Sequence, residues 1–134
     1  VIDEQSFTLN FSKEEYKSKI AKARTFGFLH EVQYLRSKGL ALGGSLENAV
    51  VLDDKKVLNT EGLRFPDEFV RHKILDAIGD MSLLGVNFIG NYEAFAGSHD
   101  LNHKLTLALL KEKDNYEIVE LSGVEAKELA HAYA

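Results

Sequence analysis

The sequence predicts an α+β fold, a two-layer sandwich in which helices pack on one face of a mixed sheet. Three observations support this fold class. Segments with a helical spacing of apolar residues alternate with short segments of strand character along the chain. Turn signals between neighbouring strands indicate hairpins, which an all-parallel sheet does not contain. The length of 134 residues suits one compact domain, so residues 1–134 are expected to form a single domain.

The first predicted elements are a strand and a helix. Residues 6–11 alternate polar and apolar side chains, as a half-buried strand does. Ser12 follows as the expected N-cap, and Glu15 stands three residues later, where a capping box requires it. The helix is predicted over residues 13–22. The side chains expected to be buried are Tyr16, Ile20 and Ala23.

A small β-α-β insert is predicted at about residues 28–52. Residues 28–37 carry apolar side chains at helical spacing, and Gly39 is the expected C-terminal stop. Residues 49–52 form an apolar, β-branched run that is typical of a buried strand. Residues 23–28, just before the insert, are predicted as a loop.

The rest of the chain is predicted to contain the longest helix and several short strands. Residues 67–84 form the longest periodic segment, which ends at Gly85. A second helix is predicted over residues 100–113, capped by Ser98, and a short helical tail closes the chain. The predicted strands are residues 57–58, 63–65, 88–95 and 116–121.

Composition and charge exclude several function classes. The formal net charge of -5 argues against non-specific binding to nucleic acid. No apolar run reaches the roughly 18 residues that indicate a membrane span, so no transmembrane segment is expected. The chain has no cysteine, which excludes disulfides, thiolate ligands and a cysteine nucleophile. With no recognisable signal peptide either, we expect a cytoplasmic protein.

A stripe of ionisable residues marks the predicted helix over residues 67–84. His72, Asp76 and Asp80 are spaced four apart and therefore share one face. An imidazole and a carboxylate at this spacing can bind one metal ion, and both suit zinc or non-haem iron. A solvated helix face has the same pattern, so spacing alone leaves both interpretations open. The opposite face is expected to pack in the core and carries Val70, Ile74, Ile78 and Met81.

Two further segments carry candidate site residues. His99 lies at a predicted helix start and His103 follows four residues later, so they form a rival metal pair, although His103 is expected to face solvent. Thr25 lies between a predicted helix and Gly27, where its hydroxyl could donate to an oxyanion. Taken alone, the segment around Thr25 is more typical of an ordinary loop.

Together these segments resemble one family, the zinc-dependent deacetylases that remove acetate from UDP-(3-O-acyl)-N-acetylglucosamine in lipid A biosynthesis. The resemblance covers roughly residues 6–110, in the order and spacing of the family. Residues 69–80, which read FVRHKILDAIGD, are the most distinctive match. The other matching segments are residues 23–28 (ARTFGF), 40–45 (LALGGS), 57–65 and 99–105.

The resemblance implies a role for each catalytic candidate. His72 and Asp76 would be zinc ligands. Thr25 would hydrogen-bond the oxyanion or the metal-bound group. His99 would be the protonated group that stabilises the oxyanion and helps the amine to leave, and Asp80 would orient His99 and favour its charged form.

The resemblance also implies substrate-binding residues. Lys73 would hold a phosphate or a nearby hydroxyl of the substrate. Phe26 and the insert at residues 28–52, beginning with Leu29, would line the passage for the fatty acyl chain. Family members often carry a basic residue near Ala96, so one contact to the diphosphate is expected to be absent here.

Part of the family's site is missing from this sequence. The family has two related halves, and the N-terminal half supplies the third zinc ligand and the general base. We therefore expect this chain alone to bind zinc poorly and to lack deacetylase activity. Two alternatives remain: a non-catalytic α+β interaction module, and a complete small metalloprotein that uses His72, Asp76 and either His99 or His103.

Overall fold

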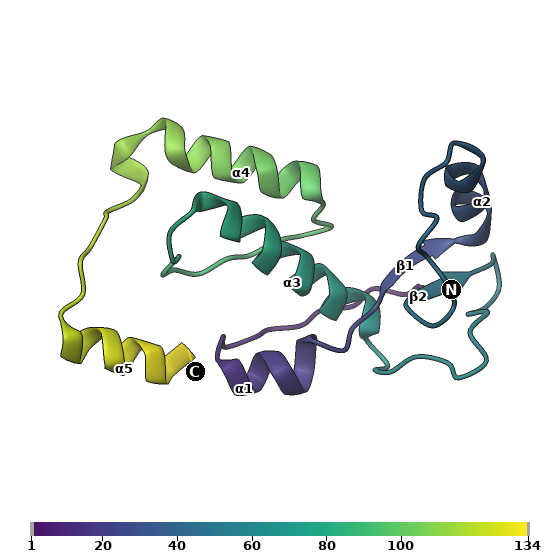
Figure 1. The fold of residues 1–134 in the computed structure, drawn as a ribbon, viewed down its shortest axis with the longest axis horizontal. Coiled ribbons are helices and arrows are strands. Elements are labelled where there is room, and N and C mark those ends of the chain that lie inside the picture. The colour runs from purple at the N-terminus through teal and green to yellow at the C-terminus, as the bar shows by residue number, and fades with distance from the viewer. Residues whose placement is uncertain (1, 134) are drawn as a thin grey trace.

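The computed structural model describes the backbone of residues 2–133 and the side chains of residues 2–128. Helix α3 (Glu68–Met81) lies at the centre, with α4 (His99–Lys111) packed along one side of it (Figure 1). A small sheet lies near the N-terminal end of α3. The α+β fold class is therefore confirmed, with helices forming most of the regular structure.

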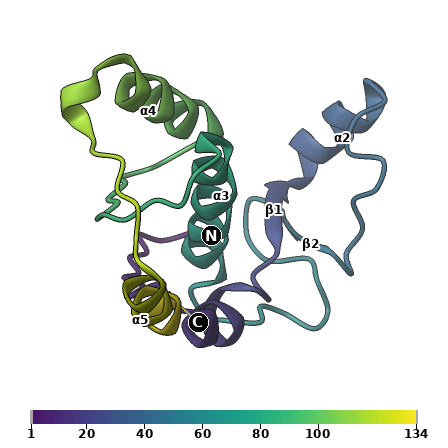
Figure 2. The same ribbon diagram turned by 60° about the vertical axis from the view of Figure 1, so that its left-hand side comes forward.

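The sheet is a β-α-β unit. Strand β1 (Thr25–Phe28) runs parallel to β2 (Ala49–Leu52), and α2 (Leu29–Ser37) connects them. Figure 2 shows this unit to one side of the α3 and α4 pair. The predicted β-α-β arrangement is confirmed, but residues 25–28 are its first strand rather than a loop. Backbone pairing with buried β2 decides their structure, because Phe26 and Phe28 pack on the core of Val50, Leu52 and Phe69.

The sheet is smaller than the sequence predicts. Among the described residues it has two parallel strands, and antiparallel pairing is confined to one bridge between Leu52 and Val57. A turn joins the two residues of this bridge, and in it the Asp53 amide donates to the Lys56 carbonyl over 3.0 Å. The remaining predicted strands are wrong, because a strand needs a neighbouring backbone and these segments pair with none of the described chain. They are residues 6–11, 63–65, 88–95 and 116–121.

The N-terminal helix begins as predicted. The Ser12 side chain accepts a hydrogen bond from the Glu15 amide over 3.1 Å and caps α1 (Lys13–Glu15). The helix continues as a π-helical segment, η1 (Tyr16–Ile20), which packs against α3. Ile20 and Ala23 are buried as expected, whereas Tyr16 is only half-buried.

Helix α3 ends as predicted, through the 3-10 turn η2 (Ser82–Leu84) and then Gly85 at a φ of 76°. Its burial differs from the prediction. Met81 is buried, but Val70, Ile74 and Ile78 are only half-buried. No sheet of the described chain covers this face, so the burial of α3 is concentrated at its ends and along its contact with α4.

Helix α4 begins at Ser98, whose side chain accepts a hydrogen bond from the Leu101 amide over 3.2 Å. It is followed by the 3-10 turn η3 (Lys113–Asn115) and by α5 (Gly123–Tyr133). Among the described residues, no helix is both long and apolar enough to cross a lipid bilayer.

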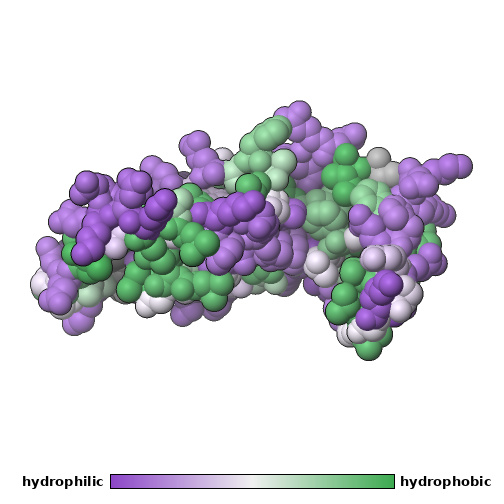
Figure 3. Space-filling model, turned by 90° about the horizontal axis from the view of Figure 1, so that it is seen from above, coloured by the Kyte–Doolittle hydropathy of each residue, from purple (hydrophilic) through white to green (hydrophobic). Residues whose placement is uncertain are grey.

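Much apolar surface remains in contact with solvent. Figure 3 shows hydrophobic side chains gathered in patches between hydrophilic ones on the face seen from above. Phe95 is 91% exposed, and Leu101 and Leu105 on α4 are about half exposed. Side chains of this size are usually covered when they cluster.

Candidate metal and acid–base site

The ionisable stripe of α3 is not a solvated face. The side chains of His72, Asp76 and Asp80 are 14%, 19% and 21% exposed. The expectation that they lie opposite the packed side of α3 is therefore wrong. They lie where the helix meets the chain just before β1 and the first turn of α4.

The contacts of His72 orient its ring. Nδ1 lies 3.1 Å from the carbonyl oxygen of Ala23, which can only accept, so Nδ1 carries the hydrogen. Nε2 then faces Asp76 Oδ1 over 3.1 Å. A free imidazole nitrogen and a carboxylate oxygen repel each other unless a cation lies between them, either a proton or a metal ion. Imidazole and carboxylate are zinc ligands, so this donor pair fits zinc, and the Ala23 contact is the outer support that such a ligand needs.

His72 and Asp76 have no third metal ligand beside them among the described side chains. Among the side chains that the structure describes, no group of three or more His, Asp or Glu residues is arranged to hold a metal ion. His103 is exposed, as predicted, and its neighbour Lys104 pairs with Asp100 on the outer face of α4. The alternative of a self-sufficient metal site that uses His103 therefore has no geometric support in this part of the chain.

An acid–base pair lies beside the metal pair. Nδ1 of His99 is 2.8 Å from Asp80 Oδ2, and its Nε2 is 3.9 Å from Asp76 Oδ2. The hydrogen bond to Asp80, and next the charge of Asp76, raise the pKa of the His99 imidazole. Burial tends to raise the pKa of Asp80, but hydrogen bonds from Asn102 and His99 outweigh it and lower that pKa. The structure thus favours a cationic imidazole held by an anionic carboxylate.

Strand β1 brings Phe26 to α3, and Thr25 is the residue before it. Thr25 is exposed at the start of β1, two residues after the Ala23 carbonyl that contacts His72. The Phe26 ring lies edge-on to Phe69 with centroids 4.9 Å apart, and its centroid is 6.5 Å from that of the His72 ring. The Lys73 ammonium lies 5.8 Å from the centre of the same Phe26 ring.

The last predicted substrate residue lies further along the insert. Leu29 starts α2 and is 38% exposed. A surface hollow of about 590 Å³ lies on the same helix, lined by His30, Glu31, Tyr34 and Leu35. Phe26 and Lys73 therefore lie beside His72. Leu29 is the first residue of α2, three residues after Phe26.

Two structural features of the site were missed by the sequence analysis. Asn102 is buried against Asp80, and its position three residues after His99 on the same helix could have indicated a shared face. Arg24 and Glu68 form a buried ion pair that joins the chain before β1 to α3. No local pattern signals that pair, because its members are far apart in the sequence.

Known proteins resemble this chain closely. A family model described as "LpxC: UDP-3-O-acyl N-acetylglycosamine deacetylase" matches residues 1–111. The chain belongs to this LpxC family. The match includes α3, β1 and the first turn of α4, which are the elements that carry the candidate site.

Relatives in the LpxC family match the chain over almost its whole length. A protein named UDP-3-O-acyl-N-acetylglucosamine deacetylase from Sulfurimonas denitrificans is 76% identical over 134 residues. Proteins of the same name from Campylobacter fetus and Wolinella succinogenes are 66% and 65% identical. These alignments cover 99–100% of the chain and 45–46% of each relative. The chain thus spans a little under half the length of the curated relatives that it matches.

Proposed function

We propose that this chain is the C-terminal domain of a zinc-dependent deacetylase that removes acetate from UDP-3-O-acyl-N-acetylglucosamine in lipid A biosynthesis. The observation that carries the proposal is the pairing of His72 with Asp76 and the approach of His99 within 3.9 Å of the same carboxylate. These distances support a site in which a metal-binding pair and an acid act on the same group. The names of the LpxC relatives support the substrate class.

Zinc is the metal that the donor set favours, and His72 and Asp76 would hold it in this domain. When bound there, zinc would supply polarisation of the acetamide carbonyl and would lower the pKa of a nearby water. Two protein ligands leave a catalytic zinc site incomplete. The third ligand and the general base would come from the half of the enzyme that precedes this domain, as the family resemblance implies.

His99 has the geometry of the group that protonates the leaving amine. Its Nδ1 is engaged by Asp80, so Nε2 is the nitrogen that can release a proton. The raised pKa of His99 favours the charged form of the ring, and the hydrogen bond to Asp80 orients it. An amine accepts that proton as the carbon–nitrogen bond of the amide breaks.

Thr25 and His99 can stabilise the negative charge that develops on the acetamide oxygen. Thr25 has an exposed hydroxyl at the start of a strand, where backbone pairing with Ala49 fixes its position. Fixed donors of this kind are commonly worth about 3 kcal/mol each in the transition state.

The substrate's two ends would contact different elements. Lys73 is exposed beside the metal pair and could hold a phosphate or a hydroxyl of the sugar nucleotide. Phe26 lies at the site, and the insert continues away from it through Leu29 along α2. An acyl chain laid along Phe26 and Leu29 would contact apolar side chains.

The missing half of the enzyme is the expected partner of this domain. Large apolar side chains such as Phe95 and Leu101 remain exposed, and the relatives contain a further part of more than half their length. Covering this surface would stabilise the domain. The chain contains no cysteine and so needs no oxidising compartment, which agrees with the predicted cytoplasmic location.

Calorimetric titration of zinc tests the proposal. We expect weak binding to the isolated chain, and its loss in His72→Ala, with the exposed His103→Ala as the matched control. Tight one-to-one binding would instead mean that the chain contains a third ligand. In the complete enzyme, His72→Ala should nearly abolish deacetylation. Unchanged activity there would favour the non-catalytic interaction module.

A further inference from the structure

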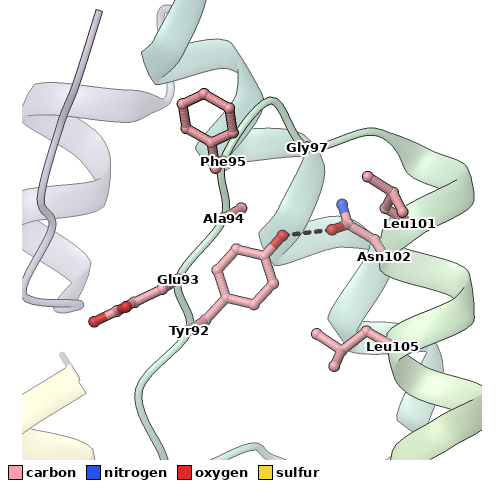
Figure 4. A pocket seen from close by; sticks show the side chains of 8 residues that line it. All are labelled: Tyr92, Glu93, Ala94, Phe95, Gly97, Leu101, Asn102 and Leu105. Atoms are coloured by element: carbon pink, nitrogen blue, oxygen red, sulfur yellow. Dashed lines mark hydrogen bonds between the residues drawn. The ribbon is translucent and has the colours of Figure 1, made fainter.

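A buried amide lies directly behind the candidate acid–base pair. Asn102 is 5% exposed and follows His99 by one turn on α4. Its Nδ2 donates to Asp80 Oδ2 over 2.9 Å, and its Oδ1 accepts the hydroxyl hydrogen of Tyr92. Figure 4 shows the Tyr92 hydroxyl and the Asn102 amide pointing at each other, at the edge of a hollow of about 230 Å³.

The partners determine which way the amide faces. A carboxylate can only accept hydrogen bonds, so Nδ2 of Asn102 must face Asp80. Oδ1 then faces Tyr92, and because an amide oxygen also only accepts, the phenol must donate. Burial and the charge of Asp80 raise the pKa of Tyr92, so the phenol keeps this hydrogen. The three side chains therefore form a row of hydrogen bonds in which Tyr92 donates to Asn102 and Asn102 donates to Asp80.

Asp80 Oδ2 consequently receives two hydrogen bonds from the first turn of α4, one from His99 and one from Asn102. The terminal torsion of a carboxylate is soft and roughly two-fold, so a single partner would leave the group free to rotate. The second bond matters because His99 itself is 70% exposed and depends on Asp80 for its orientation. The buried Asn102 amide therefore fixes the Asp80 carboxylate, and the carboxylate in turn fixes the exposed His99 ring.

We infer that Asn102, oriented by Tyr92, is a positioning residue that fixes the Asp80 carboxylate against His99. The inference rests on the proposed function. Asn102 acts through Asp80 and is buried, so it has no direct role in binding substrate. Its loss should therefore reduce kcat more than it changes KM.

The kinetic test uses the complete enzyme with three variants. Asn102→Asp keeps nearly the same shape but turns the donor into an acceptor that faces Asp80, and kcat should fall about ten-fold or more with KM little changed. Tyr92→Phe removes only the hydroxyl and should give a smaller fall in kcat. Asn115→Asp adds the same charge at an exposed amide after α4 and should retain the wild-type kcat.

Wild-type kcat in a folded Asn102→Asp enzyme would overturn the inference. If that variant does not fold, wild-type kcat in Tyr92→Phe has the same meaning. NMR gives a reading that is independent of activity: the Asn102 side-chain amide should exchange slowly with solvent, and fast exchange like that of Asn115 would contradict the inference. An inactive wild-type enzyme would defeat the proposed function, whereas the NMR result would still decide whether the row of hydrogen bonds exists.

Discussion

Arg24 and Glu68 form an ion pair whose side chains are 3% and 0% exposed. One oxygen of Glu68 accepts hydrogen bonds from the Arg24 amide and Nε, and the other accepts from Arg24 Nη2 and the Arg64 amide. Arg24 immediately follows the carbonyl that contacts His72 and immediately precedes Thr25. The pair therefore fastens the chain before β1 to the N-terminal end of α3, where the candidate site is built.

Glu68→Gln should destabilise the fold strongly. Removing one partner of a buried ion pair typically costs about 3–5 kcal/mol, because the other charge stays buried. Urea unfolding at neutral pH measures the loss. Glu47→Gln, at an exposed position of the insert, is the matched control and should unfold like the wild type.

The same pair predicts an acid dependence of stability. Burial tends to raise the pKa of Glu68, but the hydrogen bonds from Arg24 and Arg64 outweigh it and lower that pKa. The contribution of the ionised Glu68 carboxylate to the stability of the fold is therefore complete above the ordinary glutamate pKa. It is lost as the pH falls through the lower pKa of Glu68 in the folded state. On acidification, the free energy of unfolding should fall less in Glu68→Gln than in the wild type. Parallel plots of the free energy of unfolding against pH would show that Glu68 does not contribute to the acid dependence.

Leu52→Ala should loosen the β-α-β unit. Leu52 is fully buried beside Val50 and Phe69, and truncating such a leucine typically costs about 2–5 kcal/mol. Leu83→Ala, at a position that is 79% exposed, is the control and should change the free energy of unfolding little. An equal loss in the free energy of unfolding for the two variants would mean that the core around β2 does not stabilise the fold.

Arg71→Ala should release the N-terminal segment from α3. The Arg71 guanidinium lies 4.4 Å from the Phe7 ring centre and 4.3 Å from that of Phe65, and it also pairs with Asp67. Without it, residues 2–11 should be cleaved faster in limited proteolysis. Arg36→Ala, which removes an exposed bond to the Gly44 carbonyl, should leave cleavage of this segment unchanged.

Thr25→Val should lower kcat of the complete enzyme about 100-fold if its hydroxyl stabilises the developing oxyanion. Valine keeps the β-branched shape, so β1 should still pair with β2. Thr25→Ser restores the hydroxyl and should recover most of the activity. A valine variant as active as the serine variant would remove Thr25 from the proposed mechanism.

Local signals in the sequence predict the helices well. Ser12 and Ser98 cap helices, and Gly39 and Gly85 end them with positive φ, as their residue types predict. The prediction of strands at residues 88–95 and 116–121 rests on the local character of these segments, which cannot show whether a partner strand exists. The spacing of His72 and Asp76 predicted correctly that their side chains are neighbours, and their role as metal ligands stays a prediction. Their burial, and the support from Ala23, depend on contacts between distant parts of the chain that no local pattern reveals.

Strand β1 has four residues, and its two ends belong to different environments. Thr25 lies two residues after Ala23, whose carbonyl contacts His72 of α3, whereas Phe28 leads directly into α2 and the hollow on that helix. Substitutions within α2 can reshape that hollow while parallel pairing with β2 keeps Thr25 in register. Residues of α2 can therefore vary without moving the strand that carries Thr25.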